Sequence, residues 1–178
     1  PGDKAAYRER FVNWLPRASA SGLTGVFDAW AGAPSEEEAY EIWHSLSESG
    51  DLSLRVFASV RENDAADRIA AQFKRFEQSY SSQLIRPEAV KLAADGVPEG
   101  HTAFLLTPYV DSTNEDFGQP MISKANLTAN VTTYFSQDIP VHIHAIGGAA
   151  VRMCLDAIES ARATTGNESV RATIAHMD

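Results

Sequence analysis

Two histidines placed two positions apart are the residues of this chain whose types and spacing first suggest chemistry. They lie in the apolar run Val141-His142-Ile143-His144-Ala145-Ile146, which has the pattern of a buried β-strand and leads into Gly147-Gly148. Residues i and i+2 of a strand face the same way, so His142 and His144 share a face. Neutral imidazole is the commonest metal ligand in proteins, which makes the pair a candidate metal site. The alternative is a pair of buried, hydrogen-bonded histidines.

Polar residues also lie in or after the other expected strands. Asp28, Asp95 and His176 each follow an apolar run, and Lys91 lies between Val90 and Leu92. The carboxyl ends of parallel strands share one side of a sheet, where ligands bind. A turn or helix cap is the alternative role for the two aspartates, and an exposed terminal position is the alternative for His176. Burying the Lys91 ammonium costs several kcal/mol unless it is paired, so the alternative for Lys91 is an edge strand that lets it reach solvent.

The elements that must position these residues alternate along the chain. Helices are expected over 4–20, from Ser35 to Gly50, from Asn63 or Asp64 to Tyr80, from Ser123 to Phe135 and over 149–162. Strands are expected over 25–30, 54–60, 89–94, 139–146 and 170–175. Pro16 is expected to end or kink the first helix, and the long connection 97–121 is of a length that is usually functional. The alternation predicts an α/β fold with about five parallel strands in one domain, 1–178.

Composition excludes several classes of protein. The 178 residues carry a net charge of -9, which argues against binding to nucleic acid or to anionic membranes. No apolar run approaches the roughly 20 residues of a membrane-spanning helix. The chain opens without a signal-peptide pattern, so a cytoplasmic location is the default expectation. Cys154 is the one cysteine and lies on an apolar helix stripe, so we expect a buried thiol. There is also no G-x-S-x-G motif, which disfavours a serine or cysteine hydrolase.

Four motifs in order resemble those of a known family. The sequence contains Val90-Lys91-Leu92-Ala93-Ala94-Asp95-Gly96, then Thr102-Ala103 with Pro108-Tyr109, then His144-Ala145-Ile146-Gly147, then Ile174-Ala175-His176. This set resembles the amidohydrolase superfamily, in the branch that includes N-substituted formamide deformylase. Residues 22–29 and 54–56 are also similar to the second and third barrel strands of that branch, so the resemblance covers nearly the whole chain.

The resemblance implies a metal-dependent hydrolase on a TIM-type (β/α)8 barrel. In such enzymes an H-x-H pair on the first strand, a lysine on the fourth, histidines on the fifth and sixth and an aspartate on the eighth surround one or two divalent metals. Lys91, His144 and His176 would be the fourth-, fifth- and sixth-strand ligands, zinc would be the expected metal, and the lysine is often carboxylated by CO2. The reaction implied is hydrolysis of an amide-type, non-peptide C–N bond in a small molecule by metal-activated water. Asp95 is a weak candidate for a catalytic carboxylate.

Two residues depart from the pattern of the branch, and the chain is short. Gly148 stands where the branch usually has Asp, and Ala175 where it usually has Glu, so metal affinity or substrate class differs or the site is degenerate. A complete barrel needs about 250 residues, and this chain matches only the second to the sixth strand. We therefore expect an incomplete piece of a larger hydrolase that, when isolated, binds metal weakly or not at all and turns over little or nothing. We also expect it to self-associate through exposed sheet edges. The pair His142 and His144 is not taken for the first-strand pair, because Ala-Ile-Gly follows it and the Lys91 motif precedes it.

A function of another class remains open from the sequence. The chain could be a non-catalytic α/β module or a degenerate barrel that binds an anion or small molecule where Gly147-Gly148 opens a helix. Stoichiometric metal in the protein would favour the hydrolase, and its absence would favour the binding module.

Overall fold

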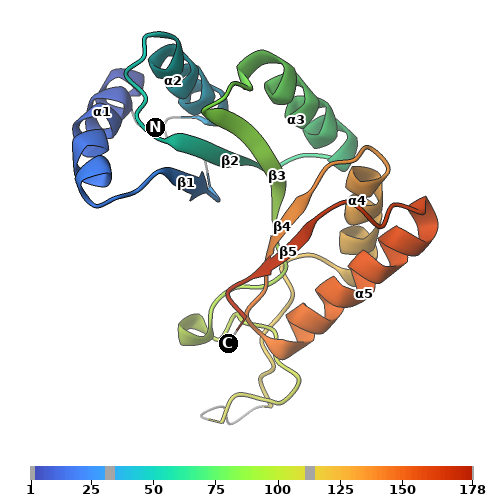
Figure 1. The fold of residues 1–178 in the computed structure, drawn as a ribbon. Helices are drawn as coiled ribbons and strands as arrows, with labels where there is room; N and C mark the ends of the chain where they lie inside the picture. The colour runs from blue at the N-terminus through green and yellow to red at the C-terminus, as the bar shows by residue number, and fades with distance from the viewer. Residues whose placement is uncertain (1–2, 31–34, 111–114, 178) are drawn as a thin grey trace. The chain divides into compact units, whose positions relative to one another are not determined.

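A computed structural model of the chain describes residues 3–30, 35–110 and 115–177. In these residues five strands alternate with α-helices (Figure 1). The strands follow one another in the sheet in the order β1-β2-β3-β4-β5, and the pairs β1–β2, β3–β4 and β4–β5 are parallel. Parallel strands in sequential order, joined by helices, are the architecture of part of a TIM-type barrel. The predicted fold class is therefore confirmed.

The chain divides into two compact units, residues 1–63 with 71–89 and residues 64–70 with 90–178. The first unit contains α1 (Lys4–Ala20), β1 (Gly25–Asp28), α2 (Glu36–Glu48), β2 (Arg55–Arg61), most of α3 (Ala66–Tyr80) and the first half of β3 (Ile85–Ala93). The second contains the rest of β3, the 3-10 helix η1 (Pro98–Gly100), α4 (Lys124–Phe135), β4 (Val141–His144), α5 (Gly148–Thr165) and β5 (Ala172–Ala175). The boundary between the two units falls within β3, at residues 89 and 90. The single domain over 1–178 stays a prediction.

The first unit buries an aromatic core and one carboxylate. Tyr40 and Trp43 of α2 are fully buried, and the Tyr40 hydroxyl donates to the carbonyl of Ala58 at 3.0 Å. Glu36, at the start of α2, is only 6 % exposed. Its carboxylate accepts hydrogen bonds from Arg61 N at 2.6 Å, Arg61 Nε at 3.2 Å and Gln72 Nε2 at 3.1 Å. Burial raises the pKa of Glu36 above its ordinary value, and the hydrogen bonds from Arg61 and Gln72 offset part of that effect.

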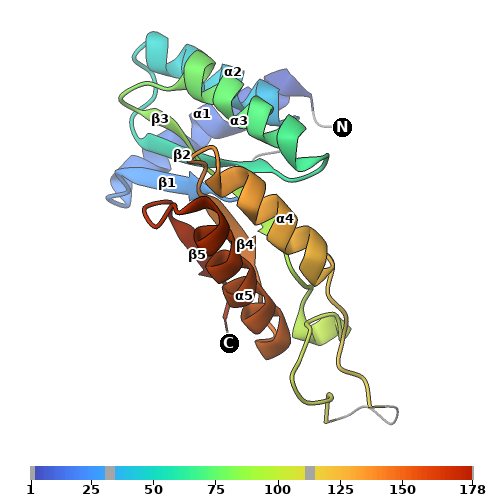
Figure 2. The ribbon, with the colours of Figure 1, turned by 90° about the vertical axis from the view of Figure 1, so that its right-hand side faces the viewer.

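The second unit packs α4 against α5 beside β4 and β5 (Figure 2). Leu127 and Val131 of α4 and Cys154 of α5 are buried in this packing. Burial raises the pKa of the Cys154 thiol to about 12. The predicted buried cysteine is therefore confirmed. None of the described helices is long and apolar enough to cross a membrane.

Several element boundaries differ from the sequence predictions. Pro16 does not end α1, which continues to Ala20 and closes with Ser21 N donating to Arg17 O at 3.1 Å, because a proline removes only one helical donor. β3 starts at Ile85 and includes Pro87, whose fixed φ is compatible with extended backbone. β1 ends at Asp28, since the Asp28 carboxylate accepts from Trp30 N at 3.0 Å and makes a turn there.

Candidate metal centre

Lys91 lies opposite His142 across the β3–β4 pair. The register aligns Lys91 with His142 and Ala93 with His144. Lys91 is 5 % exposed, and its Nζ lies 3.0 Å from Nδ1 of His142. β3 lies between β2 and β4 in the sheet order, so an edge strand with a solvent-seeking lysine does not explain this residue.

The environment of Lys91 favours its neutral form. Within the described ranges no carboxylate forms an ion pair with Lys91, and burial lowers the pKa of its amine. Burial, and then the positive charge of Lys91, lower the pKa of His142 to about 4. The His142 imidazole is therefore neutral at neutral pH, and its Nδ1 can accept a hydrogen bond from a Lys91 ammonium, which has donors only.

His144 is oriented by a backbone carbonyl. Its Nε2 lies 2.9 Å from Gly96 O, and a carbonyl can only accept, so Nε2 carries the proton of this bond. In the neutral ring Nδ1 then keeps its lone pair and can bind a metal. Metal-ligating histidines commonly donate their other N–H to such a partner, which fixes the ring and its tautomer.

His176 follows β5 directly and lies beside His144. The two ring centroids are 4.9 Å apart. His176 is exposed, and its φ of 72° is in the left-handed region, where the chain leaves the strand. The structure thus brings two of the three predicted ligands, His144 and His176, together, and places Lys91 on the neighbouring strand beside His142.

Asp95 binds backbone amides with both carboxylate oxygens. The side chain is 1 % exposed; Oδ1 accepts from Ile146 N at 3.0 Å, and Oδ2 accepts from Gly147 N at 2.8 Å and Phe104 N at 2.9 Å. These bonds take two amides away from strand pairing, which explains why β4 ends at His144 instead of Ile146. Oδ1 also lies 3.8 Å from Nε2 of His144, an ion pair only when the ring is protonated. A catalytic role for Asp95 stays a prediction; its contacts hold the loops around His144.

The start of α5 offers little to a bound anion. Ile146 N and Gly147 N donate to Asp95, while Ala149 N and Ala150 N donate to Phe104 O at 3.1 and 3.2 Å. Anion binding at a helix N-terminus depends on amides that have no other acceptor. The contacts of these four amides therefore disfavour the anion-binding alternative.

In the connection that follows β3, the backbone carbonyls of Ala103 and Phe104 pack closely against two glycines. A Cβ on Gly147 would lie 2.0 Å from Phe104 O, and one on Gly118 would lie 2.0 Å from Ala103 O. Gly118 also has a φ of +68°, which disfavours other residues. At Gly148, where the resemblance leads one to expect Asp, a Cβ would meet only the end of the flexible Leu106 side chain, at 3.3 Å. Gly148 is thus not required by packing.

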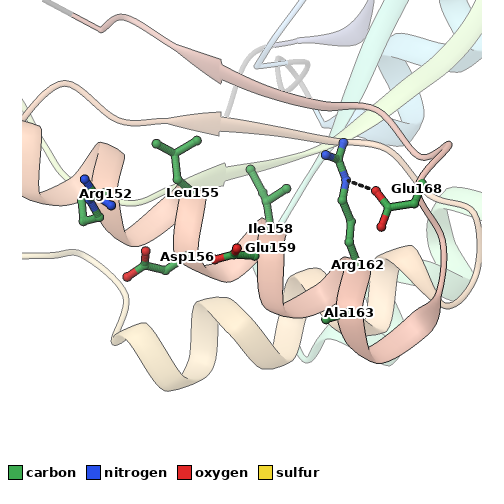
Figure 3. Close-up of a pocket in the computed structure, with 8 residues that line it drawn as sticks. All are labelled: Arg152, Leu155, Asp156, Ile158, Glu159, Arg162, Ala163 and Glu168. Carbon is green, nitrogen blue, oxygen red and sulfur yellow. Dashed lines mark ion pairs between the residues drawn. The ribbon is translucent and has the colours of Figure 1, made fainter.

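A separate hollow of about 530 Å³ lies beside α5, where Leu155, Ile158 and Arg162 point from the helix towards the strands (Figure 3). It is bounded by Leu155, which is 50 % exposed, and by the Arg162–Glu168 ion pair at 3.9 Å. None of the predicted site residues lines it. The hollow is a helix surface and adds nothing to the candidate metal centre.

Comparison with known proteins assigns the family. A model of the amidohydrolase family matches residues 1–178. The chain belongs to the amidohydrolase family. No relative was found among the curated proteins.

Two crystal structures share the fold of this amidohydrolase chain. An uncharacterized metal-dependent hydrolase from Pyrococcus furiosus has a TM-score of 0.70 and 23 % identity, over 89 % of this chain and 32 % of that one. An uncharacterized metal-dependent hydrolase from Pyrococcus horikoshii OT3 has a TM-score of 0.66 and 22 % identity, over 88 % and 31 %. The amidohydrolase chain thus spans about a third of the length of these two proteins.

The described residues fit a metal in part. His144 presents a fixed ring with Nδ1 available, His176 adjoins it, and the buried Lys91 lacks a carboxylate partner. Within 3–30, 35–110 and 115–177, however, no group of three or more His, Cys, Asp or Glu side chains could hold a metal ion. The amidohydrolase chain therefore supplies an incomplete set of ligands.

Sequence reasoning missed two contacts of this site. The spacing of His142 and His144 predicted their shared face, but nothing in the sequence indicated that His142 contacts Lys91, 51 positions away. Nor did it indicate that Gly96 O orients His144. A correct alignment of β3 with β4 was the signal that could have found the first contact.

Proposed function

We propose that this amidohydrolase chain is part of a metal-dependent hydrolase that cleaves an amide-type, non-peptide C–N bond of a small molecule. The observation that carries the proposal is Lys91, a lysine 5 % exposed on an interior strand with a neutral imidazole as its partner. A buried, uncompensated cation is costly in a protein interior. A lysine kept there, with the His142 imidazole beside it on the neighbouring strand, has the surroundings of a functional group.

Carboxylation would turn this unfavourable cation into a ligand. The neutral Lys91 amine adds to CO2, a bond forms between Nζ and carbon, and one proton leaves, so that an anionic carbamate remains. The lowered pKa of Lys91 favours this step, because only the neutral amine is nucleophilic. The carbamate oxygens suit a hard or borderline divalent cation.

In the proposed centre, His144 through Nδ1, His176 and carboxylated Lys91 would hold the metal, with zinc as the expected ion. The remaining ligands would come from parts of the full-length protein beyond the described residues. When bound, the divalent cation lowers the pKa of a water to near 7 and polarises a carbonyl. Gly96 and Asp95 keep the His144 ring and its loop in place for this chemistry.

The test is the metal content of the purified full-length protein by elemental mass spectrometry. We expect about one or two divalent ions per chain, lost on Lys91→Ala or His144→Ala. His44→Ala is the matched control, because His44 lies on α2 in the other unit. Absence of metal from the full-length wild type would contradict the proposal. Formamides, N-acyl amino acids and cyclic amides form the first panel of substrates.

A further inference from the structure

His142 and His144 share a strand face but have different partners. The His144 ring is held by the backbone of Gly96, through Nε2 at 2.9 Å. The His142 ring instead meets Lys91, with Nδ1 at 3.0 Å from Nζ. The β3–β4 register sets these two residues directly opposite each other, so the contact follows from the pairing of the strands.

From this geometry we propose that His142 is a positioning residue that holds Lys91 Nζ at one place on the ligand face. The inference deepens the proposed function and rests on it. A lysine side chain loses rotamer freedom when it is fixed, so its terminal nitrogen stays in one position where a polar group anchors it. Its neighbours in sequence, Val90 and Leu92, are buried and apolar and offer no such anchor through their side chains.

The contact would serve both chemical forms of Lys91. When the His142 ring carries its own proton on Nε2, Lys91 Nζ donates one of its hydrogens to Nδ1. After carboxylation the nitrogen would keep a single hydrogen and could donate it to the same Nδ1. The contact would then hold the carbamate in one orientation, in the way that outer partners orient metal-bound side chains.

The test compares three substitutions of His142 in the full-length protein. His142→Asn keeps an acceptor oxygen near the position of Nδ1. His142→Leu has similar size and no acceptor, and His142→Gln keeps polarity but moves the acceptor farther from the backbone. His44→Asn and His44→Leu are the matched controls on α2. Crystal structures of the metal-free forms give the position of Lys91, and titration with zinc gives the dissociation constant.

We expect the zinc dissociation constant to rise about 10- to 100-fold in His142→Leu and His142→Gln, and to stay within about threefold of wild type in His142→Asn. Lys91 should keep its position in His142→Asn and lose it in the other two. An unchanged Lys91 in His142→Leu or His142→Gln, or equal loss of affinity in all three variants, would overturn the positioning role. If wild type binds no zinc, the proposed function fails, and the Lys91 positions in the crystals alone decide the role of His142.

Discussion

Two buried charges, one in each unit, have opposite surroundings. Glu36 in the first unit is 6 % exposed and accepts three hydrogen bonds, two of them from Arg61. Lys91 in the second unit is 5 % exposed and meets the imidazole of His142, with no carboxylate paired to it among the described residues. Burial disfavours the charge of both groups, raising the pKa of Glu36 and lowering that of Lys91.

The difference supports the role proposed for Lys91. Glu36 is compensated within the fold by a guanidinium and an amide, so its burial is balanced by contacts that tie α2 to β2 and α3. Among the described residues, the polar partner of Lys91 is the neutral imidazole of His142. An apolar residue at this position would favour stability, so the burial of Lys91 supports the proposal that it serves the chemistry of the site.

The largest expected effect belongs to Lys91→Met in the full-length protein. Loss of a metal ligand should lower kcat/KM by at least about 10³-fold, since the metal supplies several kcal/mol of transition-state stabilisation. Because methionine is apolar and of similar length, the free energy of unfolding should be unchanged or higher. Steady-state kinetics and denaturant unfolding of the same sample measure both. If Lys91→Met lowered the stability and left kcat/KM unchanged, Lys91 would be a structural residue and the proposed metal ligation would be wrong.

Asp95→Asn is expected to reduce stability by about 1–3 kcal/mol, because the new amide nitrogen faces backbone donors that had a carboxylate oxygen. The midpoint of urea unfolding measures the effect. Asp28→Asn is the control: asparagine can still accept the bond from Trp30 N, so that variant should match wild type. Equal loss in both variants would mean that charge in general, and not the amide contacts of Asp95, stabilises the protein.

Glu36→Gln tests whether the buried carboxylate of the first unit contributes to stability alone. The uncharged amide weakens the bonds from Arg61, so we expect a loss of about 1–3 kcal/mol in the free energy of unfolding, with kcat/KM and metal content unchanged. Thermal unfolding and elemental analysis provide the two readouts. A change in metal content in Glu36→Gln would contradict the purely structural role assigned to Glu36.

The smallest effect concerns Cys154, a buried titratable group without a proposed role. Because burial raises its pKa to about 12, the folded thiol stays protonated at pH 8, and iodoacetamide should modify it slowly unless denaturant is present. The unfolded thiol ionises near 8.5, so stability should fall as pH rises from about 8.5 towards 12, and less so in Cys154→Ala. Mass spectrometry of the labelled protein follows the first effect, and unfolding midpoints against pH follow the second. Rapid labelling of the folded protein would show an accessible thiol.

The parts of the fold that the sequence predicted are those with local signals. Ser35 and Ser123 begin α2 and α4 as predicted, because each accepts a bond from the amide three residues on. The carboxyl end of β4 was not predictable, since Asp95, distant in sequence, binds Ile146 N and Gly147 N. The sequence predicted the residue type of each candidate ligand and the strand on which it lies. The contacts of these residues, such as that of His144 with Gly96 O, depend on strand register and loop packing, which the hydrophobic periodicity of a sequence does not predict.

The backbone carbonyls of Ala103 and Phe104 lie directly against Gly118 and Gly147, and neither glycine position tolerates a Cβ. Between these contacts Leu106 and Val110 direct exposed side chains into solvent, with Leu106 at 69 % exposure. Replacement of such side chains changes the local surface without moving the main chain that carries it. The described part of this connection therefore combines a fixed main chain at Gly118 and Gly147 with exposed side chains that can be replaced without disturbing it.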